Sequence, residues 1–404
     1  MNDVTREVRE QMAQKRPCPI CGSNDGNLLF TQQFSEMSSG SLMTSYDVVT
    51  CCDCGFAFAD NIPDQATFDA YYREMSKYEH QHRDGVESPY DLARFRSNAD
   101  LIRRFVPFPS ARILDIGCST GRLLSLIREH GFPNVTGLDP SPACAEAAQR
   151  LYGIPVLTGA LSDVSAEEGP FDFLILAAVF EHIMDITPIV AKLRQMLSPE
   201  GRVFVEVPDA TRFANHPDAP FQQFSTEHIN FFSPTSLANL IRVSGFIQLF
   251  HDEGVHEQSH GTMMPVVAAV FEVGDGPGIE RDTETEGKLA EYIRQSRAVE
   301  DRLERIIGDI VDSGRPMIVW GVGTHTLRLL ETSRLADANI SCFVDSNVRY
   351  QGKRLRGVPI IPPDELKQRT EPVLISSRVF QREIEQQIRD DLKCSNELIT
   401  LYEL

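Results

Sequence analysis

This sequence of 404 residues is short of basic charge and contains no long apolar run. It has 39 lysines and arginines against 58 acidic residues, which gives a formal net charge of -19. Because a nucleic-acid surface needs clustered basic side chains, this balance argues against a nucleic-acid partner. No apolar run approaches the roughly 20 residues that span a bilayer, and residues 1–6 lack the apolar core of a signal peptide. We therefore expect a cytoplasmic protein with no membrane partner and room for two or three domains.

In such a chain the nine cysteines are expected to be metal ligands or reduced thiols rather than a disulfide framework. Two Cys-x-x-Cys pairs, each followed by glycine, are formed by Cys18, Cys21, Cys51 and Cys54. Four thiolates match a closed, tetrahedral zinc site with a structural role. Cys52 should point away from it, and residues 30–49 could form a hairpin between the pairs. The alternative is a pair of redox or incidental cysteines. We place this zinc-binding domain at residues 1–66.

The central part of the chain is organised around Arg112-Ile-Leu-Asp-Ile-Gly-Cys-Ser-Thr-Gly121. This stretch predicts a buried strand ending at Asp115, then a glycine turn into a helix from about Arg122. Glycine lets the backbone turn sharply and approach a ligand closely, and a helix start presents free N–H groups. A second strand ends at Asp139, about twenty residues after the turn, where an acid commonly holds a ribose.

Strand and helix then alternate through the central segment. The expected strands cover residues 112–115, 135–139, 155–158, 171–177 and 201–207, and segments 247–250 and 264–273 could add an antiparallel pair. Residues 64–106, before the first strand, have helical character. The pattern predicts an α/β protein with a doubly wound sheet and a ligand at the carboxyl ends of its strands. We place this core, with its preceding lid helices, at residues 67–278.

The last segment, residues 279–404, repeats the pattern on a smaller scale. Residues 279–313 predict a connecting helix, and the strand at 316–320 again enters a glycine turn. A second strand ends at Asp345, so Gly321, Gly323 and Asp345 could bind a nucleotide in a Rossmann-like domain. The alternative is a docking domain whose turn holds no ligand.

The glycine spacing, Asp-x-Gly-x-x-x-Gly, resembles the first motif of class I S-adenosylmethionine (SAM) methyltransferases. The resemblance implies that SAM is bound by Asp115, Gly117, Cys118, Ser119, Gly121, Asp139, Pro140, Gly159, Ala160, Leu161, Ala177 and His182. Within that set, residues 117–119 would hold the methionine portion, Asp139 the ribose, and residues 159–161 the adenine. Since the methyl group of SAM is already activated, the protein mainly has to align donor and acceptor. A Rossmann fold for another nucleotide is the alternative.

Two Glu-His pairs follow, at residues 181–182 and 227–228. An imidazole beside a carboxylate is a plausible base. His228 lies on a loop past the fifth strand, where acceptors bind, so we expect a catalytic role for His228 with Glu227; a satisfied loop histidine is the alternative. In the lid segment Tyr78 is the candidate site residue, whereas Tyr71 and Tyr72 are more simply explained as helix core.

The order of motifs resembles the three-domain nucleotide-sugar C-methyltransferases that act on deoxysugar ketones. These motifs are the Cys-x-x-Cys pairs, the Asp-x-Gly-x-x-x-Gly turn, the Glu-His-x-x-Phe-Phe-Ser loop, the His260-Gly-Thr262 segment and the C-terminal glycine turn. The resemblance implies structural zinc, SAM in the central domain, a nucleotide-sugar between domains, and His228 as the base, with Glu227 and Tyr78 orienting sugar or base.

The chain departs from that pattern at two places. Ser225 stands where the family has a tyrosine, and Gly321-Val-Gly-Thr-His-Thr326 replaces the usual Ala-Pro-Ala-Lys-Gly. An O- or N-methyltransferase of a small metabolite, or a non-catalytic protein that binds SAM or a nucleotide-sugar, would share most of these features. We expect a small-molecule acceptor and a monomer or homodimer.

Overall fold

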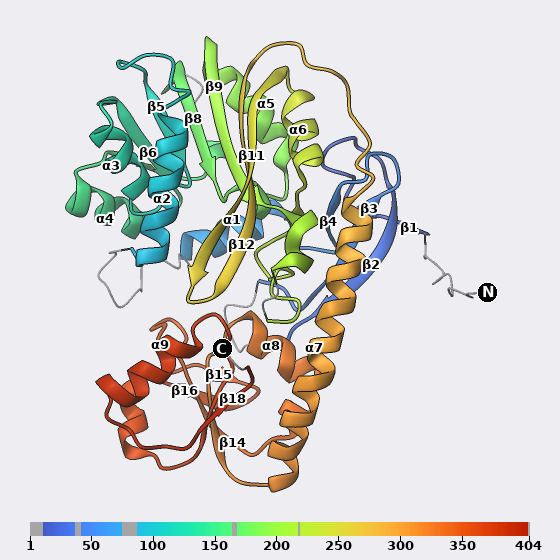
Figure 1. Ribbon diagram of the computed structural model, residues 1–404, viewed down its shortest axis with the longest axis vertical. Helices are drawn as coiled ribbons and strands as arrows, with labels where there is room; N and C mark the ends of the chain where they lie inside the picture. Colours follow the sequence, from blue (N-terminus) through green and yellow to red (C-terminus); the bar gives the residue numbers. More distant parts are fainter. Residues whose placement is uncertain (1–10, 37–41, 75–86, 164–167, 217–218, 403–404) are drawn as a thin grey trace.

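The computed structural model describes residues 11–36, 42–74, 87–163, 168–216 and 219–402. Their strands form three sheets, which Figure 1 shows as an N-terminal sheet, a central sheet and a C-terminal sheet. The long helix α7 (Thr285–Ser313) runs along one side, from the N-terminal sheet to the C-terminal sheet. No helix among these residues is long and apolar enough to cross a membrane.

The N-terminal sheet is antiparallel, in the order β1-β2-β3-β4-β10. Its strands are β1 (Gln11–Ala13), β2 (Asp25–Gln33), β3 (Ser45–Cys51), β4 (Ala57–Asp60) and β10 (Asn230–Phe231). The expected hairpin is present as β2 and β3. The last strand comes from the central segment, where Asn230 pairs with Phe58. The N-terminal unit is therefore not one continuous piece of sequence, and the predicted boundary at residue 66 stays a prediction.

The central sheet has the order β11-β12-β9-β8-β5-β6-β7, with parallel strands from β7 to β9. These strands are β5 (Ile113–Ile116), β6 (Val135–Asp139), β7 (Val156–Thr158), β8 (Phe171–Ala177) and β9 (Leu197–Pro208). Helices cover both faces, so the apolar runs of the inner strands are buried on both sides. This is the expected α/β fold of a class I methyltransferase.

One face of the central sheet packs against α2 (Pro89–Ile102), α3 (Arg122–Glu129) and α4 (Pro142–Tyr152). The other packs against α5 (Ile186–Met196) and α6 (Pro234–Arg242). Of the helical stretch expected over residues 64–106, α1 (Gln65–Glu74) and α2 are described.

The antiparallel edge is longer than the sequence predicted. β11 (Phe246–Ser259) pairs with β12 (Thr262–Val273), and β12 pairs with β9. Many β11 side chains from Asp252 onward are exposed and polar. The strand continues there because its backbone pairs with β12, which is buried along most of its length, and not because of its own apolar pattern.

Helix α7 begins at Thr285, six residues later than expected. The Asp282 carboxylate accepts hydrogen bonds from the backbone N–H of Glu284, at 2.9 Å, and of Thr285, at 3.0 Å. These contacts satisfy amides of the first turn and fix the start of the helix. Asp282 N–H also donates to the Cys54 carbonyl at 2.8 Å, so the same residue ties α7 to a cysteine pair.

The C-terminal sheet has the order β15-β16-β14-β13-β17-β18, and only β15 is antiparallel. Its strands are β13 (Met317–Trp320), β14 (Ile340–Val344), β15 (Arg354–Leu355), β16 (Val358–Ile361), β17 (Val373–Ile375) and β18 (Leu398–Thr400). Helix α8 (Thr324–Thr332) follows the glycine turn. Helix α9 (Gln381–Gln386) is continued by π-helical Gln387–Asp391.

A buried ionic cluster joins three elements of the central unit. Glu206 on β9 is 1 % exposed and lies 2.6 Å from Arg94 of α2 and 2.8 Å from His256 of β11. Burial by itself would raise the pKa of Glu206, but Arg94 and His256 outweigh it and lower the pKa from 4.5 to about 2. The cluster thereby fastens α2 and the β11–β12 hairpin to the end of β9.

Replacing Glu206 by glutamine should destabilise the protein by about 3 kcal/mol at neutral pH. Because the folded-state pKa is depressed, this stabilisation is complete above about pH 5 and is lost as the pH falls toward about 2. Urea unfolding of both proteins between about pH 7 and pH 3 measures the difference, which should shrink as the pH falls. Glu272→Gln, in a partly exposed pair with Arg202, is the control and should cost under about 1 kcal/mol. A difference independent of pH would contradict the assignment.

Candidate functional site

The first glycine turn leaves β5 at Ile116 and enters α3 at Arg122. Gly117 and Gly121 have φ values of 74° and 77°, which favour glycine, and Ser119 adopts 50°. A Cβ atom on Gly117 would lie 2.8 Å from Val179 Cγ2, so a side chain there would also collide with the loop after β8. The turn thus places backbone amides and the start of α3 at the carboxyl edge of the sheet.

Asp139, at the end of the neighbouring β6, is fastened to this turn. Its Oδ2 accepts a hydrogen bond from Ser119 N–H at 2.9 Å, and its Oδ1 accepts one from Ser141 N–H at 2.9 Å. The Gly159 N–H donates to the Asp139 carbonyl at 3.0 Å, which brings the 159–161 loop to the same place. The three segments predicted to hold one ligand therefore lie together, although their contacts with that ligand stay a prediction.

Cys118 and Asp115 are among the predicted cofactor residues that are buried. The Cys118 side chain packs among core residues, and a Cβ on Gly137 would lie 2.3 Å from its sulfur. Cys118 could therefore face a ligand only through its backbone. Asp115 is 3 % exposed, and burial first and Asp139 second raise its pKa well above its usual range.

A second group of side chains gathers beyond the carboxyl end of β8. One side-chain atom from each of Glu181, His182 and His228 lies within 4.8 Å of the others, and the two imidazole rings are 5.0 Å apart. His182 Nδ1 lies 3.0 Å from the Glu227 carbonyl oxygen. The structure thus brings both Glu-His pairs to one place.

Two tyrosines from α1 complete this group. Tyr71 OH donates to Glu227 Oε1 at 2.9 Å, and Tyr72 OH lies 3.0 Å from His182 Nδ1. Burial raises the pKa of both phenols well above the usual value, so both stay protonated. The sequence favoured helix core for both tyrosines, because a helical pattern does not show which distant group a phenol O–H contacts. Tyr78 lies outside the described residues.

Ser225, where the similar family has a tyrosine, shapes the acceptor loop, which we define as residues 221–228. Its Oγ accepts hydrogen bonds from the N–H groups of Glu227, at 3.3 Å, and His228, at 3.1 Å. Tyr46 of β3 donates to the Ser225 carbonyl at 2.9 Å. A tyrosine hydroxyl at position 225 could not reach these two nearby N–H groups. Serine in place of tyrosine therefore gives the loop hydrogen bonds of its own.

The C-terminal glycine turn is built like the first. Asp345 Oδ2 accepts a hydrogen bond from Val322 N–H at 2.9 Å, and its Oδ1 accepts one from Asn347 N–H at 2.8 Å. Gly321 has a φ of 104°, and α8 starts directly after Gly323. The three predicted residues Gly321, Gly323 and Asp345 are thus adjacent, while their ligand stays a prediction.

The two cysteine pairs also meet. The sulfurs of Cys18, Cys21, Cys51 and Cys54 lie within 4.8 Å of one another. Cys18 and Cys54 are 3.5 Å apart, as are Cys21 and Cys51. Tetrahedral zinc with bonds of about 2.3 Å requires sulfurs about 3.8 Å apart, so the donor set fits that ion. Cys52 Sγ instead contacts Asn27 Oδ1.

Comparison with known proteins agrees with this geometry. A methyltransferase-domain family model matches residues 90–247, and the model of the N-terminal part of C2185-like proteins matches residues 314–400. The C-methyltransferase NovU of Streptomyces niveus is 26% identical over 90% of this chain and 88% of its own length. The chain is a SAM-dependent methyltransferase.

Other similarities cover less of this methyltransferase. The ubiquinone biosynthesis O-methyltransferase of Xylella fastidiosa strain 9a5c is 34% identical over 28% of this chain and 48% of its own length. The crystal structure of the 1,6-didemethyltoxoflavin-N1-methyltransferase of Burkholderia thailandensis, with S-adenosylhomocysteine bound, matches 56% of this chain and 97% of its own at 20% identity and a TM-score of 0.41.

Replacing Asp139 by alanine should weaken S-adenosylhomocysteine binding at least about 100-fold, because it removes the proposed ribose acceptor and releases the Ser119 amide. Isothermal titration calorimetry measures the change. Asp172→Ala is the matched control, since that carboxylate accepts from Arg112 N–H at 2.9 Å at the other end of β5. Equal affinities for the two variants would remove Asp139 from the cofactor site.

Proposed function

We propose that this methyltransferase methylates a carbon atom of a keto-deoxysugar carried on a nucleoside diphosphate. The observation that carries the proposal is the acceptor group formed by Tyr71, Tyr72, His182, Glu227 and His228, which combines bases with protonated phenols. Similarity to a C-methyltransferase over nearly the whole chain supports the same activity.

Each part of the group has a task in enolate chemistry. His228 removes a proton from the carbon beside the ketone, and Glu227 stabilises the resulting imidazolium. The phenols of Tyr71 and Tyr72 stay protonated. Tyr71 orients Glu227 through the hydrogen bond that it donates, and Tyr72 is the hydrogen-bond donor suited to a developing enolate oxygen. Bound SAM supplies an electrophilic methyl group, which the enolate carbon attacks in line, releasing S-adenosylhomocysteine.

We infer that the nucleotide of this acceptor binds the Rossmann-like C-terminal sheet at Gly321, Gly323 and Asp345. Asp345 at its carboxyl edge and Glu227 of the acceptor loop both act electrostatically on Tyr350. Burial first, and then the carboxylates of Asp345 and Glu227, raise the pKa of Tyr350 to about 12. One extended ligand could therefore contact the glycine turn with its nucleotide and the acceptor group with its sugar.

Methyl transfer to oxygen is the second candidate, favoured by the 34% identity with an O-methyltransferase through part of the core. There His228 would remove a hydroxyl proton instead of a carbon-bound one. The two reactions differ in whether the acceptor exchanges a carbon-bound proton before methylation.

We also infer that the four-cysteine site holds a structural zinc ion. Four thiolates leave no open coordination position, so the ion would fasten the two cysteine pairs and take no part in methyl transfer. Metal analysis of protein purified without an affinity tag tests this inference. A folded protein with no zinc would contradict it.

His228→Ala should abolish turnover and leave S-adenosylhomocysteine affinity within about 3-fold of wild type, because His228 lies on the acceptor loop and not at the glycine turn. The decisive assay follows solvent deuterium entering the carbon beside the ketone of nucleotide keto-deoxysugars, with S-adenosylhomocysteine bound. Wild type should exchange this proton and the variant should not.

His130→Ala, a partly exposed histidine of the same core, is the control and should exchange like wild type. Methylated product without deuterium exchange would favour the oxygen acceptor. Exchange by His228→Ala at the wild-type rate would remove His228 from the base role.

A further inference from the structure

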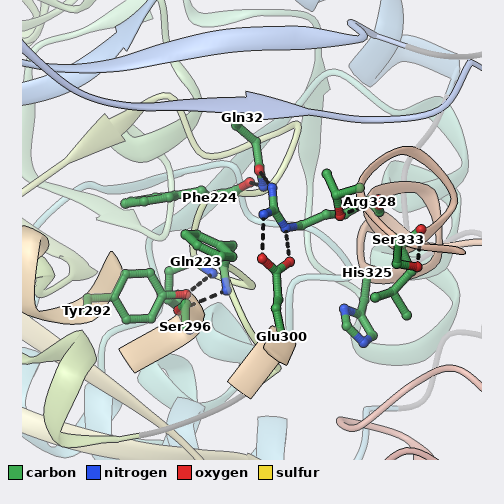
Figure 2. Close-up of polar contacts among 12 residues, drawn as sticks. Gln32, Gln223, Phe224, Tyr292, Ser296, Glu300, His325, Arg328 and Ser333 are labelled. Carbon is green, nitrogen blue, oxygen red and sulfur yellow. Dashed lines mark hydrogen bonds and ion pairs between the residues drawn. The ribbon is translucent and has the colours of Figure 1, made fainter. Parts of the chain in front are cut away.

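Arg328 of α8 lies at a junction of three parts of the chain (Figure 2). Its Nε and Nη2 pair with both carboxylate oxygens of Glu300 on α7, at 2.7 and 3.0 Å. Its Nη1 donates to Gln32 Oε1 on β2. The Arg328 side chain is only 5 % exposed, so the planar guanidinium is held in one geometry away from water.

Gln32 extends this junction to the acceptor loop. It is fully buried, and its Nε2 donates to the Phe224 carbonyl at 2.8 Å. Phe224 precedes Glu227 by three residues. The guanidinium orients one end of the Gln32 amide, and the other end of the same amide holds the backbone of the loop that carries the proposed base.

Helix α7 holds the same loop from another side. Tyr292 OH accepts a hydrogen bond from Gln223 N–H at 3.0 Å, and Ser296 Oγ accepts one from Phe221 N–H at 3.1 Å. Tyr292, Ser296 and Glu300 recur at a spacing of four residues and therefore share one face of the helix. On that face, Tyr292 and Ser296 bind the loop and Glu300 binds Arg328.

The loop conformation that these contacts hold is strained. Phe221 has a φ of 56°, a left-handed conformation that bulky residues rarely adopt. Its ring stacks on Phe30 with centroids 4.4 Å apart, and the Arg328 guanidinium carbon lies 4.0 Å from its centroid. A loop free of such contacts would relax, so the surrounding side chains determine its shape.

We propose that Arg328 is a positioning residue that couples the C-terminal glycine turn to the acceptor loop. Helix α8 begins directly after Gly323, and Arg328 lies in the second turn of that helix. A nucleotide held at the turn would therefore fix α8 and, through Arg328 and Gln32, the backbone at Phe224. The proposal rests on the proposed function only for the identity of that ligand and for the role of His228.

Hydrogen–deuterium exchange of the full-length protein tests the structural half without any acceptor. In Arg328→Lys the charge remains, but lysine cannot bind Glu300 through two parallel hydrogen bonds and reach Gln32 as well. Amide exchange in residues 221–228 should accelerate at least about 10-fold, while residues 113–129 around the first glycine turn exchange as in wild type. Glu300→Gln, a milder change, should shift the same residues in the same direction.

Arg334→Lys is the matched control, because Arg334 also pairs with a carboxylate of α7, Asp312, but on the surface. It should leave loop exchange within about 2-fold of wild type. Loop exchange in Arg328→Lys equal to that of the control would overturn the proposal. So would an acceleration of the same size in residues 113–129, since that would indicate a general loss of stability.

A second arm adds uridine or thymidine diphosphate with S-adenosylhomocysteine present. A probe that binds should protect residues 221–228 in wild type, and in Arg328→Lys it should bind without protecting them. Equal protection in both proteins would overturn the coupling. If neither probe binds, the nucleotide assignment fails, and the ligand-free comparison still decides whether Arg328 positions the loop.

Discussion

The acceptor loop, residues 221–228, depends on hydrogen bonds with side chains that lie far from it in the sequence. Those side chains are Gln32 on β2, Tyr46 on β3, Tyr71 on α1, and Tyr292 and Ser296 on α7. The central sheet alone could not fix a loop with this strained backbone. The N-terminal sheet and α7 therefore hold the loop that carries His228.

The two glycine turns illustrate a constraint that recurs in the chain. Each turn is closed by a carboxylate at the end of the next parallel strand. This carboxylate accepts one hydrogen bond from a backbone N–H of the turn and one from a backbone N–H of its own loop. In the first turn this carboxylate is Asp139, and in the second it is Asp345. Since these hydrogen bonds hold the amides in place, both turns are preorganised.

Local sequence pattern predicted the parts of the fold that are locally determined. The parallel strands of the central sheet, the hairpin of β2 and β3, and both glycine turns follow from apolar runs and glycine positions. The predicted start of α7 was wrong by six residues, because the hydrogen bonds of the Asp282 carboxylate fix the start of the helix. Strand β10 was missed because two residues carry no periodic signal.

The residues of the candidate site also fall into those that a local pattern predicts and those that only tertiary contacts bring together. Residues near one turn, such as Gly117 and Asp139, could be found from spacing, whereas Arg328 could not. Arg328 lies in an ordinary helical stretch, and its partners Gln32 and Glu300 come from distant parts of the sequence. The pairing of Tyr71 with Glu227 was hidden for the same reason. Only the folded chain brings these residues together.

Calorimetry with S-adenosylhomocysteine already bound, titrating nucleoside diphosphates and nucleotide-sugars in turn, tests the nucleotide-sugar acceptor most directly. We expect micromolar binding of one nucleotide, and loss of that binding when Asp345 is replaced by alanine. Tight binding of S-adenosylhomocysteine with no binding of any nucleotide would contradict the nucleotide-sugar acceptor, and it would leave a methyltransferase whose C-terminal sheet serves another purpose.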